Sequence, residues 1–190
     1  MTDMKQKQNK IVVIALFGKS GAGKDYLIKT LPPNEYHKII PTTTRPKRDY
    51  EVNGVDYHFI TVEDMTAKVL QGDMIEVTDF NNWFYGTEFS ELREDKINIG
   101  IFNIHAIECI LQDERLEVYP IYINSSPKTR LLRALYREEK PDCWEICRRF
   151  LADEKDFDDI GFIYNTYWNE EDSTGPLDKV IKDIIAKIDI

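Results

Sequence analysis

The sequence predicts an α/β fold in which a parallel sheet is flanked by helices. Continuous apolar runs rich in β-branched residues recur along the 190-residue chain, as in strands that are buried on both faces. Helical patterns separate these runs, and such alternation is typical of a parallel sheet with helices on both sides. The first apolar run also leads straight into a glycine-rich turn and a helix.

The first predicted strand is IVVIALF, residues 11–17, and a helix over 24–31 follows the glycine-rich turn and ends at a Pro-Pro pair. Further strands are predicted over the apolar runs 97–104, 118–123 and 162–165. A last helix is expected to begin near Pro176. Its core-facing stripe consists of Leu177, Val180, Ile181, Ile184, Ile185 and Ile188.

The segment from about residue 42 to residue 89 breaks this rhythm, because it is rich in aromatic and charged residues and in short strand-like pieces. Within it, Thr61 and Asp64 have the spacing of a capping box that opens a helix ending near Gly72. We therefore expect one domain with a small mixed α/β subdomain inserted in its parallel core. The expected parts are the core over 11–41 and 90–190, the insertion over about 42–89 and a flexible tail over 1–10.

Composition disfavours several classes of function. A formal net charge of -9 and a pI near 4.9 argue against a general nucleic-acid binder. No apolar run approaches the roughly 20 residues that span a bilayer, and the polar N-terminus lacks the apolar centre of a signal peptide. We expect a cytoplasmic protein without a membrane partner. The three cysteines have no metal-ligand spacing and are expected to be reduced.

The stretch FGKSGAGKDY, residues 17–26, has the phosphate-loop spacing G-x-x-x-x-G-K. Glycines let backbone N–H groups converge on phosphate oxygens, and the following helix adds the positive end of its dipole. The lysine of such a loop reaches the β- and γ-phosphates. The sheet is therefore predicted to be of the P-loop NTPase type. The expected ATP-binding residues of the loop are Gly18, Ser20, Gly21, Ala22, Gly23, Lys24 and Asp25.

Asp25 stands where phosphate loops usually carry a serine or threonine hydroxyl that holds Mg²⁺. A carboxylate is also a hard oxygen ligand for this ion, and a cation between it and the phosphates would offset their repulsion. We interpret Asp25 as a metal ligand and Mg²⁺ as the cofactor. The alternative is an acid in the first helical turn that only complements the helix dipole.

The stretch TTTRPKRDYEVNGVDYHF, residues 42–59, resembles the guanylate kinase family, whose members transfer a phosphoryl group from ATP to GMP. It matches the family pattern T-T-R-x-x-R followed by Glu, Gly and D-Y-x-F. A second match is MIEVTDFNNWFYGT, residues 74–87, which supplies a Glu and, nine residues later, the turn Y-G-[ST]. The resemblance extends from Gly18 to Asn165 and covers most of the chain.

The resemblance implies a GMP site with two parts. Glu76 would accept the adjacent N1–H and N2–H donors of guanine, a pair that adenine lacks, while Thr87 and Thr42 would offer hydroxyls to the base. A phosphate dianion calls for guanidinium forks and phenol hydroxyls. The residues that the resemblance assigns to the GMP phosphate are Arg45, Arg48, Tyr57 and Tyr85.

A third region resembles the helical lid of the family, expected at about 134–150. Arginines delivered by a closing lid would neutralise charge on the transferred group and exclude water. The resemblance implies that Arg133 and Asn165 bind ATP. The residues assigned to the transferred phosphoryl group are Lys24, Arg137 and Arg149, with Arg45 bridging from the acceptor side.

The sequence departs from the family pattern L-D-I-D, because this chain reads FNIH over residues 102–105. Asn103 and His105 replace two acids, one of which usually helps to organise Mg²⁺ and the acceptor. Our hypothesis is that this carboxylate has moved from the strand to the loop, as Asp25. The lid also lacks the usual glycines and carries Pro141.

Three functions stay open at this point: a guanylate kinase making GDP or dGDP, a nucleoside monophosphate kinase with another acceptor, and a binding module that turns over poorly. The intact glycines, Lys24 and the lid arginines favour catalysis, whereas the altered acids favour the module. The expected partners are the nucleotides ATP and GMP.

Overall fold

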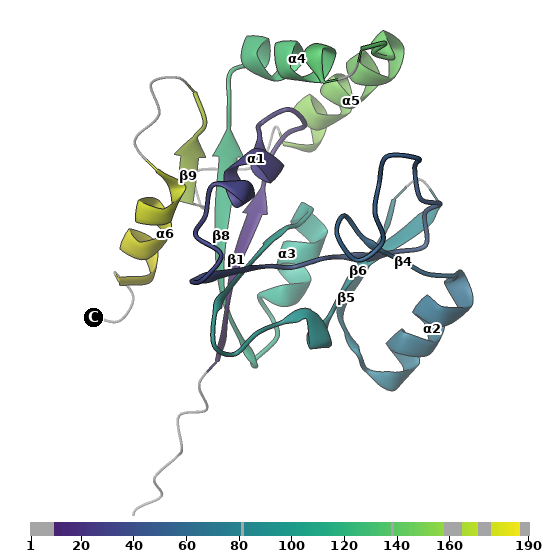
Figure 1. Cartoon of the computed structure of the whole chain (residues 1–190), viewed down its shortest axis with the longest axis vertical. Helices are drawn as coiled ribbons and strands as arrows, with labels where there is room; N and C mark the ends of the chain where they lie inside the picture. Colours follow the sequence, from purple (N-terminus) through teal and green to yellow (C-terminus); the bar gives the residue numbers. More distant parts are fainter. Residues whose placement is uncertain (1–9, 81, 138, 158–164, 171–175, 187–190) are drawn as a thin grey trace, which may run out of the picture.

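The core of the protein is a five-stranded sheet in which all neighbouring strands run parallel (Figure 1). The structure, a computed structural model, describes residues 10–80, 82–137, 139–157, 165–170 and 176–186. The strand order is β2-β7-β1-β8-β9, and the parallel sheet confirms the predicted fold class. These strands are β1 (Ile11–Phe17), β2 (Tyr36–Lys38), β7 (Ile97–Ile101), β8 (Leu116–Asn124) and β9 (Asn165–Trp168).

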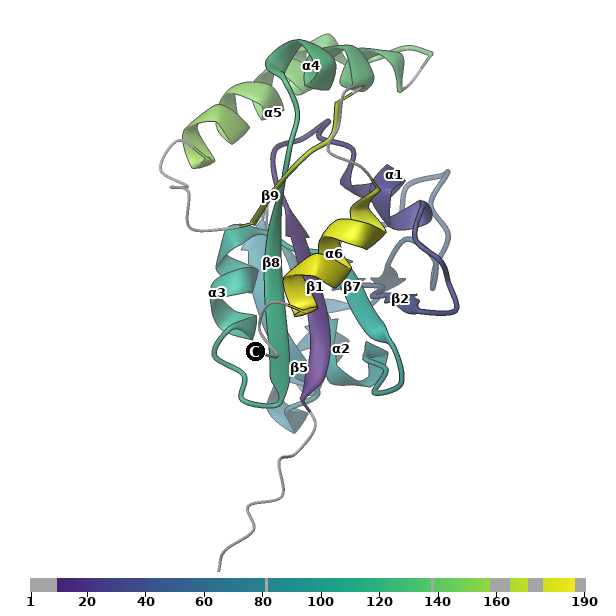
Figure 2. The same cartoon turned by 90° about the vertical axis from the view of Figure 1, so that its left-hand side faces the viewer.

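Helices cover both faces of this sheet (Figure 2). Successive side chains of a strand point to opposite faces, so β1 serves two hydrophobic clusters. Ile14 packs in the cluster of the first face and Ala15 in the cluster of the second. The first face is covered by α1 (Lys24–Lys29) and α6 (Leu177–Ala186), and the second by α3 (Ile104–Ile110).

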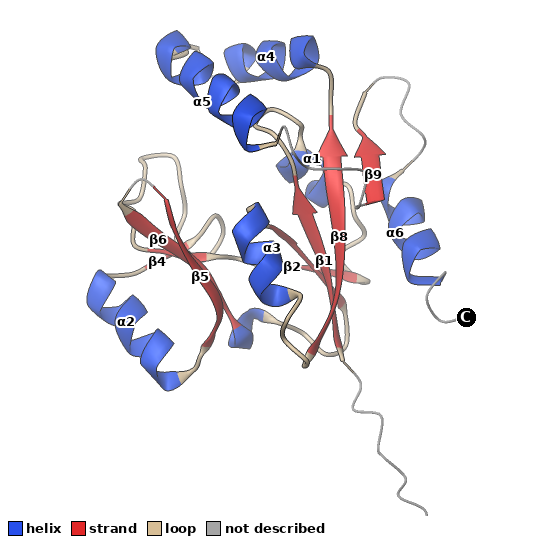
Figure 3. Ribbon diagram, turned by 180° about the vertical axis from the view of Figure 1, so that it is seen from behind, coloured by secondary structure: helices blue, strands red, loops and turns tan. Residues whose placement is uncertain are grey.

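A second sheet of four strands lies beside the core, in the order β4-β3-β6-β5 (Figure 3). Its β3 and β4 are parallel and its other pairs antiparallel, so it is mixed as expected. The predicted capping box is present: the Thr61 hydroxyl accepts from the Asp64 N–H at 3.1 Å. The elements of this part are β3 (Thr42–Thr43), β4 (His58–Phe59), α2 (Val62–Gln71), β5 (Met74–Phe80), β6 (Trp83–Glu88) and the short helix Phe89–Glu91.

Two further helices, α4 (Pro127–Tyr136) and α5 (Cys143–Asp156), follow the carboxyl end of β8 (Figure 1). Each begins at a polar cap: Ser126 Oγ accepts from the Thr129 N–H, and Asp142 Oδ1 accepts from the Glu145 N–H at 3.0 Å. Helix α5 extends six residues past the predicted end of the lid at 150. Of the helices described, none has the length and apolar character that a membrane span requires.

Two strand predictions need correction. The strand predicted over 97–104 ends at Ile101, because Asn103 instead caps α3 by accepting from the Ala106 N–H at 2.7 Å. The strand predicted over 162–165 overlaps β9 only at Asn165, and residues 162–164 lie outside the described residues. The predicted helices over 24–31 and from Pro176 are present as α1 and α6.

Candidate functional site

The glycine-rich loop after β1 is closely packed against the elements that follow β8. Gly21 and Gly23 have φ angles of 79° and 89°, which only glycine adopts readily. A Cβ atom on Gly21 would lie 2.6 Å from the Arg130 carbonyl oxygen, and one on Gly23 would lie 2.3 Å from Asn169 Nδ2. The sequence therefore needs glycine here both for the turn and for the close approach of its neighbours.

Lys24 begins α1 and turns its side chain back over the loop. Its Nζ donates to the Gly18 carbonyl at 2.6 Å and to the Lys19 carbonyl at 3.2 Å. Burial lowers the pKa of Lys24, and the nearby carboxylates of Asp153 and Asp25 act in the opposite direction. An ammonium group that is bound only by carbonyl oxygens in a desolvated place is well suited to receive an anion.

Asp25 is exposed in the first turn of α1, one residue after Lys24. Among the described residues, no group of three or more histidines, cysteines and acids is arranged to hold a metal ion. A single accessible carboxylate still fits Mg²⁺, because this ion is usually bound by one or two carboxylates together with substrate phosphates and water. Asp25 is therefore suited to hold Mg²⁺ only in combination with a bound nucleotide.

Arg133 and Asn169 brace the loop from the side of α4 and β9. Arg133 Nη1 donates to the Ala22 carbonyl at 3.3 Å and to Ser125 Oγ at 3.1 Å. Asn169 Nδ2 donates to the Ala22 carbonyl at 2.7 Å. Sequence reasoning placed Arg133 near the loop but missed Asn169.

The prediction for Asn165 needs a corresponding correction. Asn165 begins β9 and pairs with Ile121 in the middle of β8. Asn169 directly follows β9, and its N–H bonds the Asn124 carbonyl at 2.8 Å, at the carboxyl end of the sheet where the loop lies. The family resemblance was matched at Asn165, whereas the residue that lies beside the loop is Asn169.

Helix α5 places two carboxylates against the loop. The backbone N–H of Ser20 donates to Asp153 Oδ2, and Lys19 Nζ lies 2.6 Å from Glu154 Oε2. Glu154 also accepts from Arg130 on α4. None of these three partners of the loop was identified from the sequence.

The other two lid arginines point elsewhere in this structure. Arg137 is exposed at the end of α4. Arg149 Nε donates to Glu145 Oε1 at 2.6 Å on its own helix, where Arg148 binds the same carboxylate. Hydrogen bonds from Arg148 and Arg149 lower the pKa of Glu145 to about 2. Arg149 is therefore engaged within α5 in this structure.

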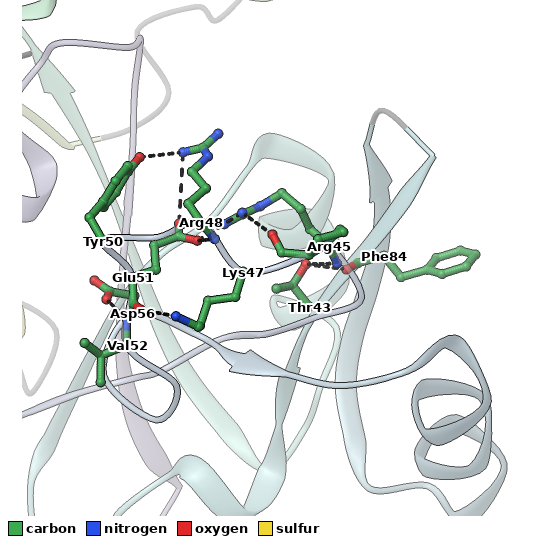
Figure 4. A network of polar contacts seen from close by, with 10 residues as sticks. Thr43, Arg45, Lys47, Arg48, Tyr50, Glu51, Val52, Asp56 and Phe84 are labelled. Carbon is green, nitrogen blue, oxygen red and sulfur yellow. Dashed lines mark hydrogen bonds and ion pairs between the residues drawn. The ribbon is translucent and has the colours of Figure 1, made fainter.

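The residues that the resemblance assigned to the GMP phosphate lie mainly in the loop between β3 and β4, and Figure 4 shows the polar network of this loop. Arg45 donates to both oxygens of Glu51, at 3.0 Å and 2.7 Å, and Glu51 also accepts from the Arg48 N–H at 2.8 Å. The hydrogen bond from Arg45 lowers the pKa of Glu51, which keeps this buried carboxyl ionised. Arg48 is exposed, and its Nη1 donates to Tyr50 Oη at 3.1 Å.

Two tyrosines complete this site. The Arg45 guanidinium lies 5.4 Å from the centre of the Tyr57 ring, and the Tyr57 and Tyr85 rings meet edge to face at 6.1 Å. The nearby Tyr85 phenol contributes to the raised pKa of Arg45, after the larger effect of Glu51. The structure thus brings together three of the four residues that the sequence assigned to one phosphate group, and Arg48 lies on the same loop.

Glu76 and Thr87 face each other across β5 and β6. Thr87 Oγ1 donates to Glu76 Oε1 at 2.8 Å, while Glu76 Oε2 is buried and has no hydrogen-bond partner among the described residues. Burial raises the pKa of Glu76 to about 7. A buried carboxylate oxygen without a partner is costly, so this site favours a ligand that supplies N–H donors.

Thr42 is directed away from this pair. Its side chain is fully buried, and its hydroxyl donates to Glu88 Oε1 at 2.8 Å. Glu88 is held in turn by Lys68 of α2 at 2.7 Å. Thr42 therefore has a structural bond in the second sheet, and its hydroxyl hydrogen is already engaged.

The glycine-rich loop and the cluster around Arg45 belong to different sheets, but a charge beside the loop acts on a side chain of the cluster. Burial is the main cause of the raised pKa of Tyr57, and the charge of Asp25 beside the phosphate loop adds to it. Helix α3 of the core is also joined to β5 of the second sheet, because Asn103 Nδ2 donates to Thr78 Oγ1 at 2.9 Å. The first turn of α3 carries His105, whose charge acts on Glu76.

Known proteins resemble this chain in sequence and in fold. The family model for guanylate kinase matches residues 8–185. Guanylate kinase of Wigglesworthia glossinidia brevipalpis is 32% identical over 190 residues, which cover 94% of this chain and 89% of that protein. The crystal structure of guanylate kinase from Anaplasma phagocytophilum has a TM-score of 0.61 at 20% identity, covering 94% of this chain and 85% of that one.

Longer proteins match as well. Disks large homolog 1 of Danio rerio is 36% identical over 100 residues, which cover 51% of this chain but 11% of that protein. Protein PALS1 of Danio rerio is 32% identical over 142 residues, or 71% of this chain and 21% of that protein. The chain thus spans only a small part of these two relatives.

Proposed function

This chain belongs to the guanylate kinase family, and we propose that it transfers the terminal phosphoryl group of ATP to GMP or dGMP. The products would be ADP and the corresponding guanosine diphosphate. This reaction belongs to purine nucleotide metabolism, and we place it in the cytoplasm, as the sequence predicts.

The observation that carries the proposal is the pairing of two cationic sites across the two sheets. The loop with Lys24 follows β1 of the core, and the cluster of Arg45 and Tyr57 lies at the end of the second sheet. The charge of Asp25 acts on Tyr57, so the two sites are close enough to influence each other. Phosphoryl transfer needs donor and acceptor held in line with their charges neutralised, and little covalent chemistry.

The first site would hold the triphosphate of ATP. Convergent backbone N–H groups and the N-terminus of α1 favour negative charge, and Lys24 would exchange its carbonyl contacts for β- and γ-phosphate oxygens. Arg133 and Asn169 would keep the loop in shape by holding the Ala22 carbonyl. Arg137 and Arg149 are proposed to reach the transferred group when the lid closes.

The second site would hold GMP. Arg45, Tyr57 and Tyr85 surround a place for the phosphate dianion, with Arg48 adding an exposed guanidinium from the same loop. The free Oε2 of Glu76 and its Oε1 would accept the N1–H and N2–H groups of guanine. Adenine presents no such pair of donors, so Glu76 would select guanine.

Mg²⁺ fits Asp25 as an exposed carboxylate in the first turn of α1. When bound, the ion would neutralise charge on the β- and γ-phosphates. The role of Asp25 is then to fix the ion, and its charge also counteracts the lowering of the Lys24 pKa by burial.

A second candidate function is a module that binds nucleotides without turning them over. Asn103 and His105 favour it, because they replace the two acids of the family pattern. The complete phosphate loop and Lys24 favour catalysis, because Lys24 lies over the loop, where it would neutralise charge on the transferred phosphoryl group.

A coupled assay of ADP release tests the proposal. We expect Mg²⁺-dependent turnover with GMP and dGMP, and little turnover with AMP, UMP or dTMP. Lys24→Met is the control for contaminating kinases and should remove the activity. Turnover with another acceptor would point to the shifted-acceptor alternative. Nucleotide binding without turnover of any acceptor would favour the binding module.

A further inference from the structure

Two consecutive carboxylates on α5 bind hydrogen-bond donors of the loop that a phosphate would otherwise bind. Asp153 accepts the backbone N–H of Ser20, in the middle of the glycine-rich loop. Glu154 lies 2.6 Å from Lys19 Nζ, on the preceding loop residue. A loop N–H and a loop ammonium are the groups with which a phosphate loop binds its anion, so these two acids take the place of anionic ligands.

The third member of this cluster is Arg130 on α4, whose side chain is only 2% exposed. One of its nitrogens donates to Glu154, and its guanidinium lies 4.6 Å from the centre of the Phe150 ring. Its Nε and Nη1 are buried and have no hydrogen-bond partner within the described part of the chain. Buried guanidinium N–H groups without acceptors are costly, so the structure keeps donors here that its own side chains do not use.

The backbone of Arg130 also lies directly against the glycine-rich loop. A Cβ atom on Gly21 would meet the Arg130 carbonyl oxygen at 2.6 Å and its Cα at 3.0 Å. The positive charge of Arg130 acts on Lys24 and contributes to lowering its pKa, whereas Asp153 acts in the opposite sense. Arg130, Lys24 and Asp153 therefore share one small region above the loop.

We propose that Arg130 is a further phosphate ligand of the triphosphate site, and that Asp153 and Glu154 hold the place of the phosphates until a nucleotide displaces them. A polyphosphate carries enough acceptor oxygens for the Ser20 N–H, the Lys19 ammonium and the free guanidinium nitrogens. The planar guanidinium group of arginine can donate two parallel hydrogen bonds to phosphate oxygens.

Displacement of Asp153 and Glu154 by phosphates explains two features of this cluster that a purely structural ion pair would not explain. A structural pair of Arg130 and Glu154 would need neither a carboxylate on the Ser20 N–H nor two unused donors. Displacing two carboxylates requires several contacts at once, which a polyphosphate makes and a single phosphate ion does not. The inference rests on the proposed function in one respect, namely that this loop binds a nucleoside di- or triphosphate.

The first test measures the binding of ADP and of tripolyphosphate without Mg²⁺ by calorimetry. We expect Asp153→Asn to bind both about tenfold more tightly than the wild type, because the competing carboxylate is gone. Asp156→Asn is the matched control: it makes the same charge change at an exposed position of the same helix, and its affinity should stay within about twofold of the wild type. Unchanged or weaker binding by Asp153→Asn, or equal tightening by both variants, overturns the inference.

The second test isolates Arg130. Glu154→Gln should bind ADP more tightly than the wild type, and adding Arg130→Met should then weaken binding by about tenfold. The double variant leaves no uncompensated buried charge, and its unfolding temperature without ADP reports whether it folds. Lys155→Met in the Glu154→Gln background is the control for loss of an exposed cation on α5. If Glu154→Gln and the double variant bind ADP equally, Arg130 does not contact phosphate and the inference is wrong.

The wild-type titration separates this inference from the proposed function. Failure of the wild type and of every carboxylate variant to bind ADP would overturn both. Binding by the wild type with no gain in Asp153→Asn would overturn the exchange alone and leave the proposed function standing.

Discussion

Asn103 Nδ2 donates a hydrogen bond to Thr78 Oγ1 at 2.9 Å, and this bond joins α3 of the core to β5 of the second sheet. The other end of the same amide caps α3, because its oxygen accepts from the Ala106 N–H at 2.7 Å. Asn103 therefore links the start of α3 to the sheet that carries Glu76.

The double role of Asn103 gives a first prediction. An aspartate can still cap the helix and can accept a bond from the Thr78 hydroxyl, so Asn103→Asp should leave the free energy of unfolding nearly unchanged. Asn103→Ala loses both bonds, and we expect a loss of about 1 to 2 kcal/mol. Urea unfolding at neutral pH measures both values. Equal destabilisation by the two variants would contradict this reading of the amide.

The second prediction concerns the metal ligand. Asp25→Ala should abolish the Mg²⁺-dependent turnover of ATP and GMP, because no other carboxylate of the described loop is exposed beside Lys24. Asp25→Ser combined with Asn103→Asp should retain some turnover, since it returns the acid to its usual family position. The assay is a titration of Mg²⁺ at fixed nucleotide concentrations. An intact rate in Asp25→Ala would show that Asp25 is not the ligand.

The third prediction is a pH dependence of guanine recognition. Guanine donors bind the ionised form of Glu76, whose pKa burial raises to about 7. GMP affinity should therefore be full above this pKa and fall as the pH drops through about 7. The phosphate of GMP titrates nearby, with a second pKa of about 6, so Glu76→Gln serves as the reference. At pH 8, the affinity of that variant for GMP should be lower by about tenfold or more. Its GMP affinity should also no longer change as the pH passes through about 7. If GMP affinity still falls near pH 7 in Glu76→Gln, the titrating group is the GMP phosphate and not Glu76.

The fourth prediction distinguishes two asparagines of one strand region. Asn169 Nδ2 holds the Ala22 carbonyl at 2.7 Å, whereas Asn165 lies at the opposite end of β9. We expect Asn169→Ala to raise KM for ATP by about five- to tenfold, with little change in KM for GMP, because one hydrogen bond at the loop is lost. Asn165→Ala should leave KM for ATP near the wild-type value. The reverse order of effects would restore the sequence-based assignment.

Local patterns predicted much of this protein. The glycine spacing, the capping box at Thr61 and the continuous apolar strands are short-range signals, and the structure contains each of them. Arg45, Tyr57 and Tyr85 were assigned to one site through a family pattern, and they do meet. The family membership predicted from these motifs is confirmed by the match over residues 8–185.

Contacts between distant segments were not predictable in the same way. Asp153 and Glu154 look like ordinary polar residues of an amphipathic helix, and only the packing of α5 shows that they face the loop. Arg130 lies three residues before Arg133, and the sequence did not indicate which of the two would be buried. The family pattern was matched at Asn165, and only the structure shows that Asn169, directly after β9, is the asparagine beside the loop.

The proposed phosphoryl transfer requires that the two proposed anion sites face each other and hold both nucleotides at once. A compound that joins adenosine and guanosine through a chain of five phosphates measures this directly by calorimetry. We expect it to bind at least about 100-fold more tightly than ADP or GMP alone, because the second contact becomes intramolecular. Lys24→Met and Arg45→Met should each remove most of this gain. An affinity no higher than that of the better single nucleotide would contradict the facing arrangement and the phosphoryl transfer built on it.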